Sequence, residues 1–294
     1  MKEITLEELL EAGCHFGHQV TRQNPKAREF VFEARDNIHI IDLEKTKEGL
    51  DQAAAFIKSV AAQGGTLLLV GTKRQAQTVV AEEIKRATVA LGKTTPSEAG
   101  LFFVTNRWIG GTLTNFGEVL KNYKKLKNIK KLLVDDQEKA AYTKKEIGQF
   151  EKAKEKLESF YGGVADMQAM PEAMFIIDTH LEELAVDESG KMSIPSVGIV
   201  DTNADPHIID YPIPANDDAV GSVKLLTGYI IDAWIEGKTE KVKNDKVAQE
   251  KSEAAAVEAE KAAKAPVVEE KTAEKAPKVK KEKKTAEPKT KKTK

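Results

Sequence analysis

Four short, mostly apolar runs constrain the fold of this chain more than any other feature. They cover residues 66–70, 101–104, 173–178 and 196–201, and glycine, proline or polar residues bound each of them. Runs of this length without polar alternation are typical of parallel strands buried on both faces of a sheet. Helical patterns, with apolar residues three and four apart, lie between the runs. The sequence therefore predicts an α/β fold with a doubly wound parallel sheet.

The 294 residues are enough for one large domain or two small ones with a sizeable core. The single cysteine, Cys14, excludes a disulfide framework and suits a reducing compartment. The first residues lack the apolar segment of a signal peptide, and no apolar run approaches the ~18 residues of a membrane helix. We therefore expect a cytoplasmic protein without a membrane partner.

The net charge of −1 hides an uneven distribution. Residues 241–294 contain 17 lysines and 10 acidic residues, whereas residues 1–240 contain 29 basic and 37 acidic residues. The body of the protein is thus acidic, which argues against non-specific binding of nucleic acid over its whole surface. Any contact with RNA must come from local basic patches.

We expect four parts along the chain. Residues 1–42 form an N-terminal extension, with a short helix and a hairpin that turns at Asp36 and Asn37. Residues 43–115 and 162–237 form the α/β domain, and two helical patterns in 116–161 predict an inserted coiled-coil hairpin. Residues 238–294 lack aromatic side chains and consist mainly of Lys, Glu, Ala, Pro and Thr, so we predict a disordered tail.

The predicted hairpin carries the clearest basic patch. Six lysines follow one another without an acidic residue between them, and they are Lys121, Lys124, Lys125, Lys127, Lys130 and Lys131. Lysines placed in this way bind phosphates without reading sequence. The alternative interpretation is a solvated helix face that binds nothing.

Other basic residues lie in turns beside the predicted strands. Arg22 and Lys26 flank a turn at Asn24, and we expect both to bind RNA. Lys73 and Arg74 open the helix after the first apolar run, where a helix N-terminus can receive an anion, and we expect them to bind RNA as well. In the segment 106–115, Arg107 and Trp108 follow the second run. Arg107 can bind a phosphate while Trp108 stacks on a base, or both can close the top of the sheet.

Acidic residues gather where the later strands end. Asp178 and Asp201 end two runs, and Asp217 and Asp218 begin the last helix. The carboxyl ends of parallel strands meet at one edge of the sheet, so these carboxylates, together with His18, are candidates for a divalent ion or a hydrolase site. They can equally cap helices and tie loops by hydrogen bonds.

Several longer segments together resemble the family of bacterial small-subunit ribosomal protein two, the S-two family. The resemblance is carried by residues 16–19, 38–43, 71–76, 106–115, 198–203 and 213–218, and it extends over residues 4–237. One departure is Gln23, where the family usually has tryptophan. The resemblance does not cover the C-terminal tail.

The resemblance implies a flavodoxin-like sheet of five parallel strands, an inserted helical hairpin and no catalysis. It also implies a position between the head and body of the small subunit, contact with ribosomal RNA, and support for docking of the messenger-binding protein S-one. Some members hold zinc without requiring it as a cofactor, and the resemblance indicates that His18, Asp201 and Asp218 converge as candidate zinc ligands. The rival hypothesis is a nucleotide-binding or metal-dependent enzyme on the same fold. The missing phosphate-binding motifs and general base favour the binding protein.

Overall fold

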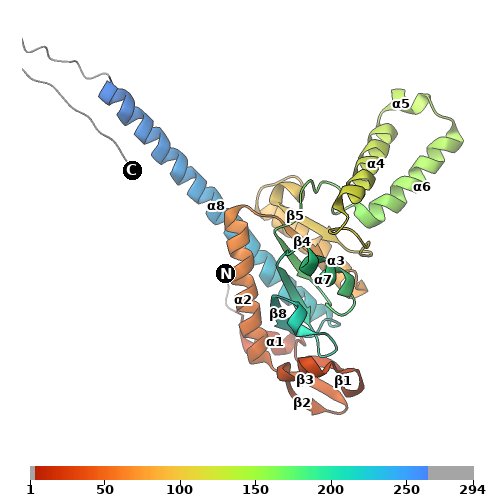
Figure 1. Ribbon diagram of the computed structural model, residues 1–294, viewed down its shortest axis with the longest axis vertical. Helices are drawn as coiled ribbons and strands as arrows, with labels where there is room; N and C mark the ends of the chain where they lie inside the picture. The colour runs from red at the N-terminus through yellow and green to blue at the C-terminus, as the bar shows by residue number, and fades with distance from the viewer. Residues whose placement is uncertain (1–3, 264–294) are drawn as a thin grey trace, which may run out of the picture. The chain divides into compact units, whose positions relative to one another are not determined.

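The computed structural model describes residues 4–263, and the described residues as far as Val247 form one compact unit (Figure 1). At its centre is a sheet of five parallel strands with the order β5-β4-β6-β7-β8. The strands are β4 (Leu67–Val70), β5 (Leu101–Val104), β6 (Ala173–Ile176), β7 (Ser196–Val200) and β8 (Tyr211–Pro214). The four predicted apolar runs are the four strands β4 to β7, and the order is that of flavodoxin-like folds. The predicted α/β fold is therefore confirmed.

The residues of the strands alternate between two apolar cores, one on each face of the sheet. Leu67 and Leu69 pack with residues of α2 (Leu43–Gln63), α3 (Arg74–Ala90) and α8 (Val220–Ala263). Leu68 and Val70 pack on the other face with α7 (Glu183–Lys191) and with the first turns of α4 (Phe116–Val134). Because both faces are covered, nearly every residue of β4, β6 and β7 is apolar and buried.

β8 lies at the edge of the sheet and contains Pro212 and Pro214. Proline cannot donate a hydrogen bond to a neighbouring strand, which suits an edge position. Short 3-10 helices precede β5 and β8, and they span Ser97–Ala99 and Pro206–Ile208.

The N-terminal extension contains a helix and a small antiparallel sheet of order β1-β3-β2. Its elements are α1 (Leu6–Glu11), β1 (Phe16–Gln19), β2 (Val31–Arg35), β3 (Ile38–Ile41) and 3-10 turns at Val20–Arg22 and Pro25–Phe30. Between β2 and β3, Asp36 and Asn37 have φ of 50° and 65°, the left-handed conformation that two-residue hairpin turns require. Asn216 ties this extension to the body, since its backbone N–H donates to the Cys14 carbonyl and its side chain donates to the Gly13 carbonyl.

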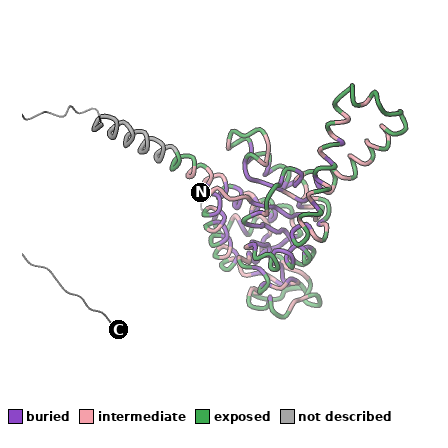
Figure 2. Tube along the Cα trace, turned by 45° about the horizontal axis from the view of Figure 1, so that its top comes forward, coloured by how far each residue is buried: buried purple, intermediate pink, exposed green. Residues whose placement is uncertain are grey.

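The segment between β5 and β6 forms a helical hairpin of α4, α5 (Asp136–Ala140) and α6 (Lys144–Tyr161). Figure 1 shows α4 and α6 side by side, and Figure 2 shows that the far end of the hairpin is largely exposed. Val119, Tyr123, Leu126 and Ile129 form the buried stripe of α4. The coiled-coil character of this insertion remains a prediction.

The last helix differs from the sequence-based expectation. We predicted a helix that ends near Gly237 and a disordered tail from residue 238, whereas α8 continues to Ala263. The physical reason is composition, because alanine, glutamate and lysine are strong helix formers even where no apolar face requires burial. The remainder of the predicted tail, residues 264–294, lies outside the described residues.

Candidate functional site: a charged sheet edge and a basic hairpin

The loop of residues 106–115 is held in place by one buried carboxylate, that of Glu188 in α7. Its Oε1 accepts hydrogen bonds from the Trp108 indole N–H (3.1 Å) and the Gly111 backbone N–H (2.8 Å). Its Oε2 accepts from the backbone N–H groups of Leu113 (2.9 Å) and Thr114 (3.1 Å). Burial raises the pKa of Glu188, but these hydrogen bonds outweigh it, and the pKa lies below its ordinary value.

Trp108 is therefore part of the core. Its side chain is only 6% exposed, so it has no free ring face on which an RNA base could stack, and we withdraw it from the predicted RNA contacts. Of the two interpretations of this tryptophan, the structure favours closure of the sheet top. Arg107 is exposed, and no ionic partner is recorded for it within residues 4–263, so its guanidinium is free to bind phosphate.

Lys73 is not a free cation either. Its Nζ lies 3.0 Å from Asp178 Oδ2, 2.9 Å from Asp217 Oδ1 and 2.6 Å from Asp218 Oδ1. Burial lowers the pKa of Lys73, but the three carboxylates outweigh it and hold the pKa above its ordinary value. We therefore withdraw Lys73 from the RNA contacts as well. Its neighbour Arg74 is exposed at the start of α3.

The two basic residues of the N-terminal turn behave differently from each other. Lys26 forms an ion pair with Asp205. Arg22 is exposed, and no partner is recorded for it in the described part of the chain. Only Arg22 of this pair can therefore bind a phosphate without first breaking an ion pair.

The six hairpin lysines also divide into two groups. Three form ion pairs, Lys121 with Glu118, Lys127 with Asp166 and Lys130 with Glu158. The other three are exposed and have no ionic partner among the described residues, and these are Lys124, Lys125 and Lys131. The partner of Lys121 lies three residues before it on α4, but the pairs of Lys127 and Lys130 could not be read from the sequence, because Asp166 and Glu158 come from beyond the tip of the hairpin.

The acidic residues at the carboxyl ends of the strands do converge, as predicted. Asp178, after β6, has φ of 65°, which is rare for a residue other than glycine and turns its carboxylate toward Lys73. Asp217 is buried among Asp178, Asp201 and Lys73. Burial and the two neighbouring carboxylates raise the pKa of Asp217 to about 7, although Lys73 acts in the opposite direction. A phosphate would meet these carboxylates, which argues against nucleotide binding at this edge.

His18 reaches the same edge from β1. Its backbone N–H donates to Thr202 Oγ1 (2.9 Å), just beyond the end of β7. Gly17 permits this approach, because a Cβ at residue 17 would lie 2.7 Å from Thr202 Cγ2. The His18 ring then lies with Nδ1 3.0 Å from Asp201 Oδ2 and Nε2 3.5 Å from Asp218 Oδ2. Contact with Asp201 raises the pKa of His18.

The atoms of this cluster fit a metal ion in one respect. His18 Nδ1 and Asp201 Oδ2 are both buried and lie close together, yet neither has a partner with hydrogen-bond geometry. The ligand atoms of His18, Asp201 and Asp217 lie within 4.8 Å of one another. The structure thus favours the buried Asp217 over the predicted Asp218 as the third ligand, since Asp218 is half-exposed, although both carboxylates also pair with Lys73. An imidazole and two carboxylates are ordinary zinc ligands.

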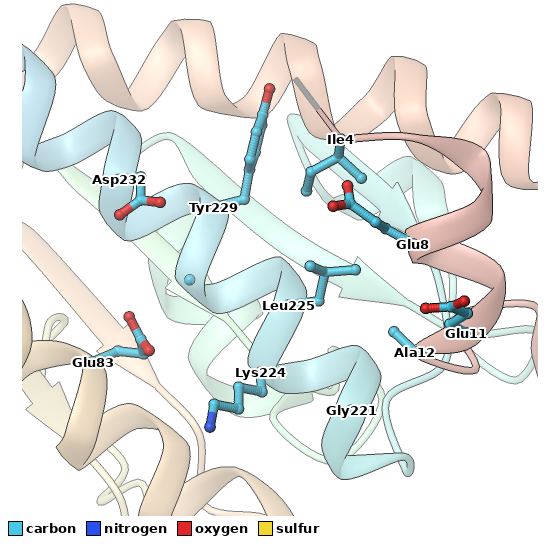
Figure 3. A pocket seen from close by; sticks show the side chains of 11 residues that line it. Ile4, Glu8, Glu11, Ala12, Glu83, Gly221, Lys224, Leu225, Tyr229 and Asp232 are labelled. Carbon is cyan, nitrogen blue, oxygen red and sulfur yellow. The ribbon is translucent and has the colours of Figure 1, made fainter. Parts of the chain in front are cut away.

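A separate hollow of about 560 Å³ lies between α1, α3 and α8. Figure 3 shows the acidic side chains Glu8, Glu11, Glu83 and Asp232 around it, with Lys224 at one side. Arg86 forms ion pairs with both Glu83 and Asp232 (2.7 Å and 2.6 Å). The charged residues that line this hollow are mostly acidic, so it is unsuited to a phosphate.

Together these features define a flavodoxin-like α/β protein whose sheet edge is closed by acidic side chains and whose helical insertion carries three exposed lysines without an ionic partner among the described residues. A family sequence model described as Ribosomal protein S2 matches residues 9–237, and the chain belongs to that family. It is accordingly a structural protein of the small ribosomal subunit and not an enzyme. Within the described part of the chain, no helix is both long and apolar enough to span a bilayer.

Proposed function

We propose that the chain binds ribosomal RNA between the head and body of the small subunit, in the cytoplasm, through its helical hairpin. The observation that carries this proposal is the set of three exposed lysines, Lys124, Lys125 and Lys131, without an ionic partner among the described residues. Each lysine that contacts a phosphate releases counterions and makes binding depend on salt. Arg74 and Arg107 add exposed cations on the body, and Arg22 adds one on the N-terminal extension.

The test is the salt dependence of binding to small-subunit ribosomal RNA. Changing Lys124 and Lys125 to Gln should weaken binding and reduce the slope of log affinity against log salt by about one unit per lost contact. Changing Lys127 and Lys130 to Gln is the matched control, since both already bond acidic side chains. An equal effect of both pairs, or an unchanged slope, would refute the assignment of the hairpin as the phosphate-binding element.

We also propose that the N-terminal extension helps to dock the messenger-binding protein S-one. Leu10, Phe16 and Phe32 support this, since they are 53%, 48% and 71% exposed on one small extension. Leu10 and Phe32 line a hollow of about 340 Å³ there, and such exposed apolar groups favour contact with another protein.

The docking surface is tested by Phe32→Ser, with Val89→Ser as the control because Val89 is 70% exposed on α3, on the body. We expect Phe32→Ser to lower the S-one content of purified small subunits without lowering the content of this chain. Normal S-one content in the Phe32 variant would contradict the proposal.

We further propose that His18, Asp201 and Asp217 hold a zinc ion. The unpartnered atoms His18 Nδ1 and Asp201 Oδ2 support it, and the competing account is a histidine–carboxylate contact without metal. Bound zinc would stabilise the junction of β1, β7 and the start of α8. Elemental analysis of purified protein should find zinc that is lost in His18→Ala and kept in His180→Ala, an exposed histidine. If His18→Ala leaves the zinc content and the chelator sensitivity of melting unchanged, these residues hold no metal.

A further inference from the structure

The hairpin contains a groove of about 660 Å³, which is lined by α4 on one side and by Tyr142 and α6 on the other. We call it the hairpin groove. The side chains that line it and matter here are Lys124, Lys125, Asn128, Tyr142, Gln149 and Phe150. None of the residues that line it is acidic. This composition differs from the acid-rich hollow between α1, α3 and α8.

The groove contains aromatic side chains that are only partly buried by the fold. Tyr142 is 39% exposed, and its ring centroid lies 5.2 Å from that of Phe150 at an interplanar angle of 85°. A T-shaped contact of this kind uses the edge of one ring and one face of the other, so ring faces remain available. Aromatic faces at the surface of RNA-binding proteins stack on unpaired bases.

Cations and amides surround these rings. Lys124 and Lys125 are exposed and have no ionic partner among the described residues, so both can bind phosphates on either side of a base. Asn128 and Gln149 are exposed on α4 and α6, and no hydrogen-bond partner is recorded for either within residues 4–263. An amide side chain carries both a donor and an acceptor and can bond the edge of a base.

We propose that the hairpin groove binds one unstacked nucleotide of a single-stranded segment of ribosomal RNA. The base stacks on the exposed ring of Tyr142, which Phe150 supports through the T-shaped contact, its edge meets Asn128 and Gln149, and the flanking phosphates bind Lys124 and Lys125. The inference rests on the proposed function and extends it from phosphate contact to recognition of an unpaired base. The lysine rim without acidic residues favours RNA over a helix of another protein as the occupant.

The test compares two labelled RNA probes of equal phosphate number, a mixed-sequence single strand and a fully paired, blunt-ended duplex. Tyr142→Ala should weaken binding of the single strand by about fivefold to tenfold, the lower range of stacking losses on alanine substitution, and should leave the paired probe unaffected. Tyr142→Phe should restore binding because it keeps the ring. Changing Lys124 and Lys125 to Gln should weaken binding of both probes and lower the salt slope for the single strand by about 1.4. Lys152→Gln with Lys156→Gln is the control, since both lysines are exposed on α6 outside the groove.

If Tyr142→Ala binds the single strand with unchanged affinity and is incorporated normally into small subunits, the groove does not bind a base. The proposed function would then still stand. Failure of the unchanged chain to bind either probe would instead contradict the proposed function. A photo-crosslinking residue at position 142 should join RNA in assembled subunits. A crosslink to a protein there would assign the groove to a protein partner and overturn this inference.

Discussion

At the scale of single residues, Glu188 lies buried beneath the loop of residues 106–115 and accepts hydrogen bonds from Trp108 and three backbone N–H groups. This role of Glu188 could not be predicted from the sequence, because a glutamate within a helical pattern is ordinarily exposed. The loop sequence predicts a sharp turn but contains no acidic residue of its own. The orientation of Trp108 therefore depends on a partner more than 70 residues away, which no local pattern can reveal.

Glu188→Gln should destabilise the protein by about 1–3 kcal/mol at neutral pH, because a buried, charged acceptor of four N–H groups becomes neutral. The hydrogen bonds lower the pKa of Glu188 in the folded state, so its contribution is present above the unfolded pKa and lost as pH falls through the folded pKa. The difference between the unchanged protein and the variant in urea unfolding should thus shrink in acid. Glu183→Gln on the exposed side of α7 is the control, and an equal effect of both variants would show that Glu188 has no special role.

Arg107 and Trp108 should respond differently to conservative substitution. Arg107→Lys should lower affinity for small-subunit ribosomal RNA severalfold with unchanged stability, since a lysine cannot bind a phosphate in a bidentate manner. Trp108→Phe should lower the melting temperature and leave affinity unchanged, since the indole N–H is bonded to Glu188 inside the core. Filter binding and thermal melts of both variants measure this, and a loss of affinity in Trp108→Phe would restore the tryptophan to the interface.

At the scale of elements, the sheet was predictable because burial on both faces leaves continuous apolar runs. The turn at Asp36 and Asn37 was predictable because few residues adopt positive φ in succession. The pairing of charges was not predictable. Lys73 and Lys124 look alike in sequence, yet the first lies among three carboxylates brought by β6 and α8, and the second faces solvent.

The helix α8 extends further than its apolar face requires, and its middle turns still contact the body. Lys238 Nζ donates to the Gly65 carbonyl (2.6 Å) and lies 4.6 Å from the centre of the Trp234 ring, and Glu240 pairs with Lys58 (2.7 Å). The predicted boundary at residue 238 therefore separates residues that belong to one packed helix. The compact unit ends later, at Val247.

Two truncations test this boundary. Removal of residues 248–294 should leave the melting temperature unchanged, whereas removal of residues 238–294 should lower it by several degrees. The second truncation loses a charged hydrogen bond worth about 1.5–3 kcal/mol, and each kcal/mol corresponds to roughly 2–4 °C in a protein of this size. Differential scanning calorimetry of both truncated proteins measures this difference. Equal melting temperatures would show that the packed unit ends at residue 238.

At the scale of the whole molecule, the distribution of charge limits contact with RNA to local basic patches. Residues 1–240 have eight more acidic than basic residues, and residues 241–294 have seven more lysines than acidic residues. The acidic edge of the sheet repels phosphate, whereas the hairpin presents lysines without ionic partners among the described residues. This distribution of charge suits a structural protein of the small ribosomal subunit, as membership of the Ribosomal protein S2 family implies.

The central claim, that the chain is a structural component of the small ribosomal subunit, is tested most directly by sedimentation of a cell extract through a sucrose gradient at low magnesium. The account predicts that the chain sediments with the separated small subunit and is absent from the large-subunit fraction. A chain found at the top of the gradient with free proteins, or with the large subunit, would contradict the account.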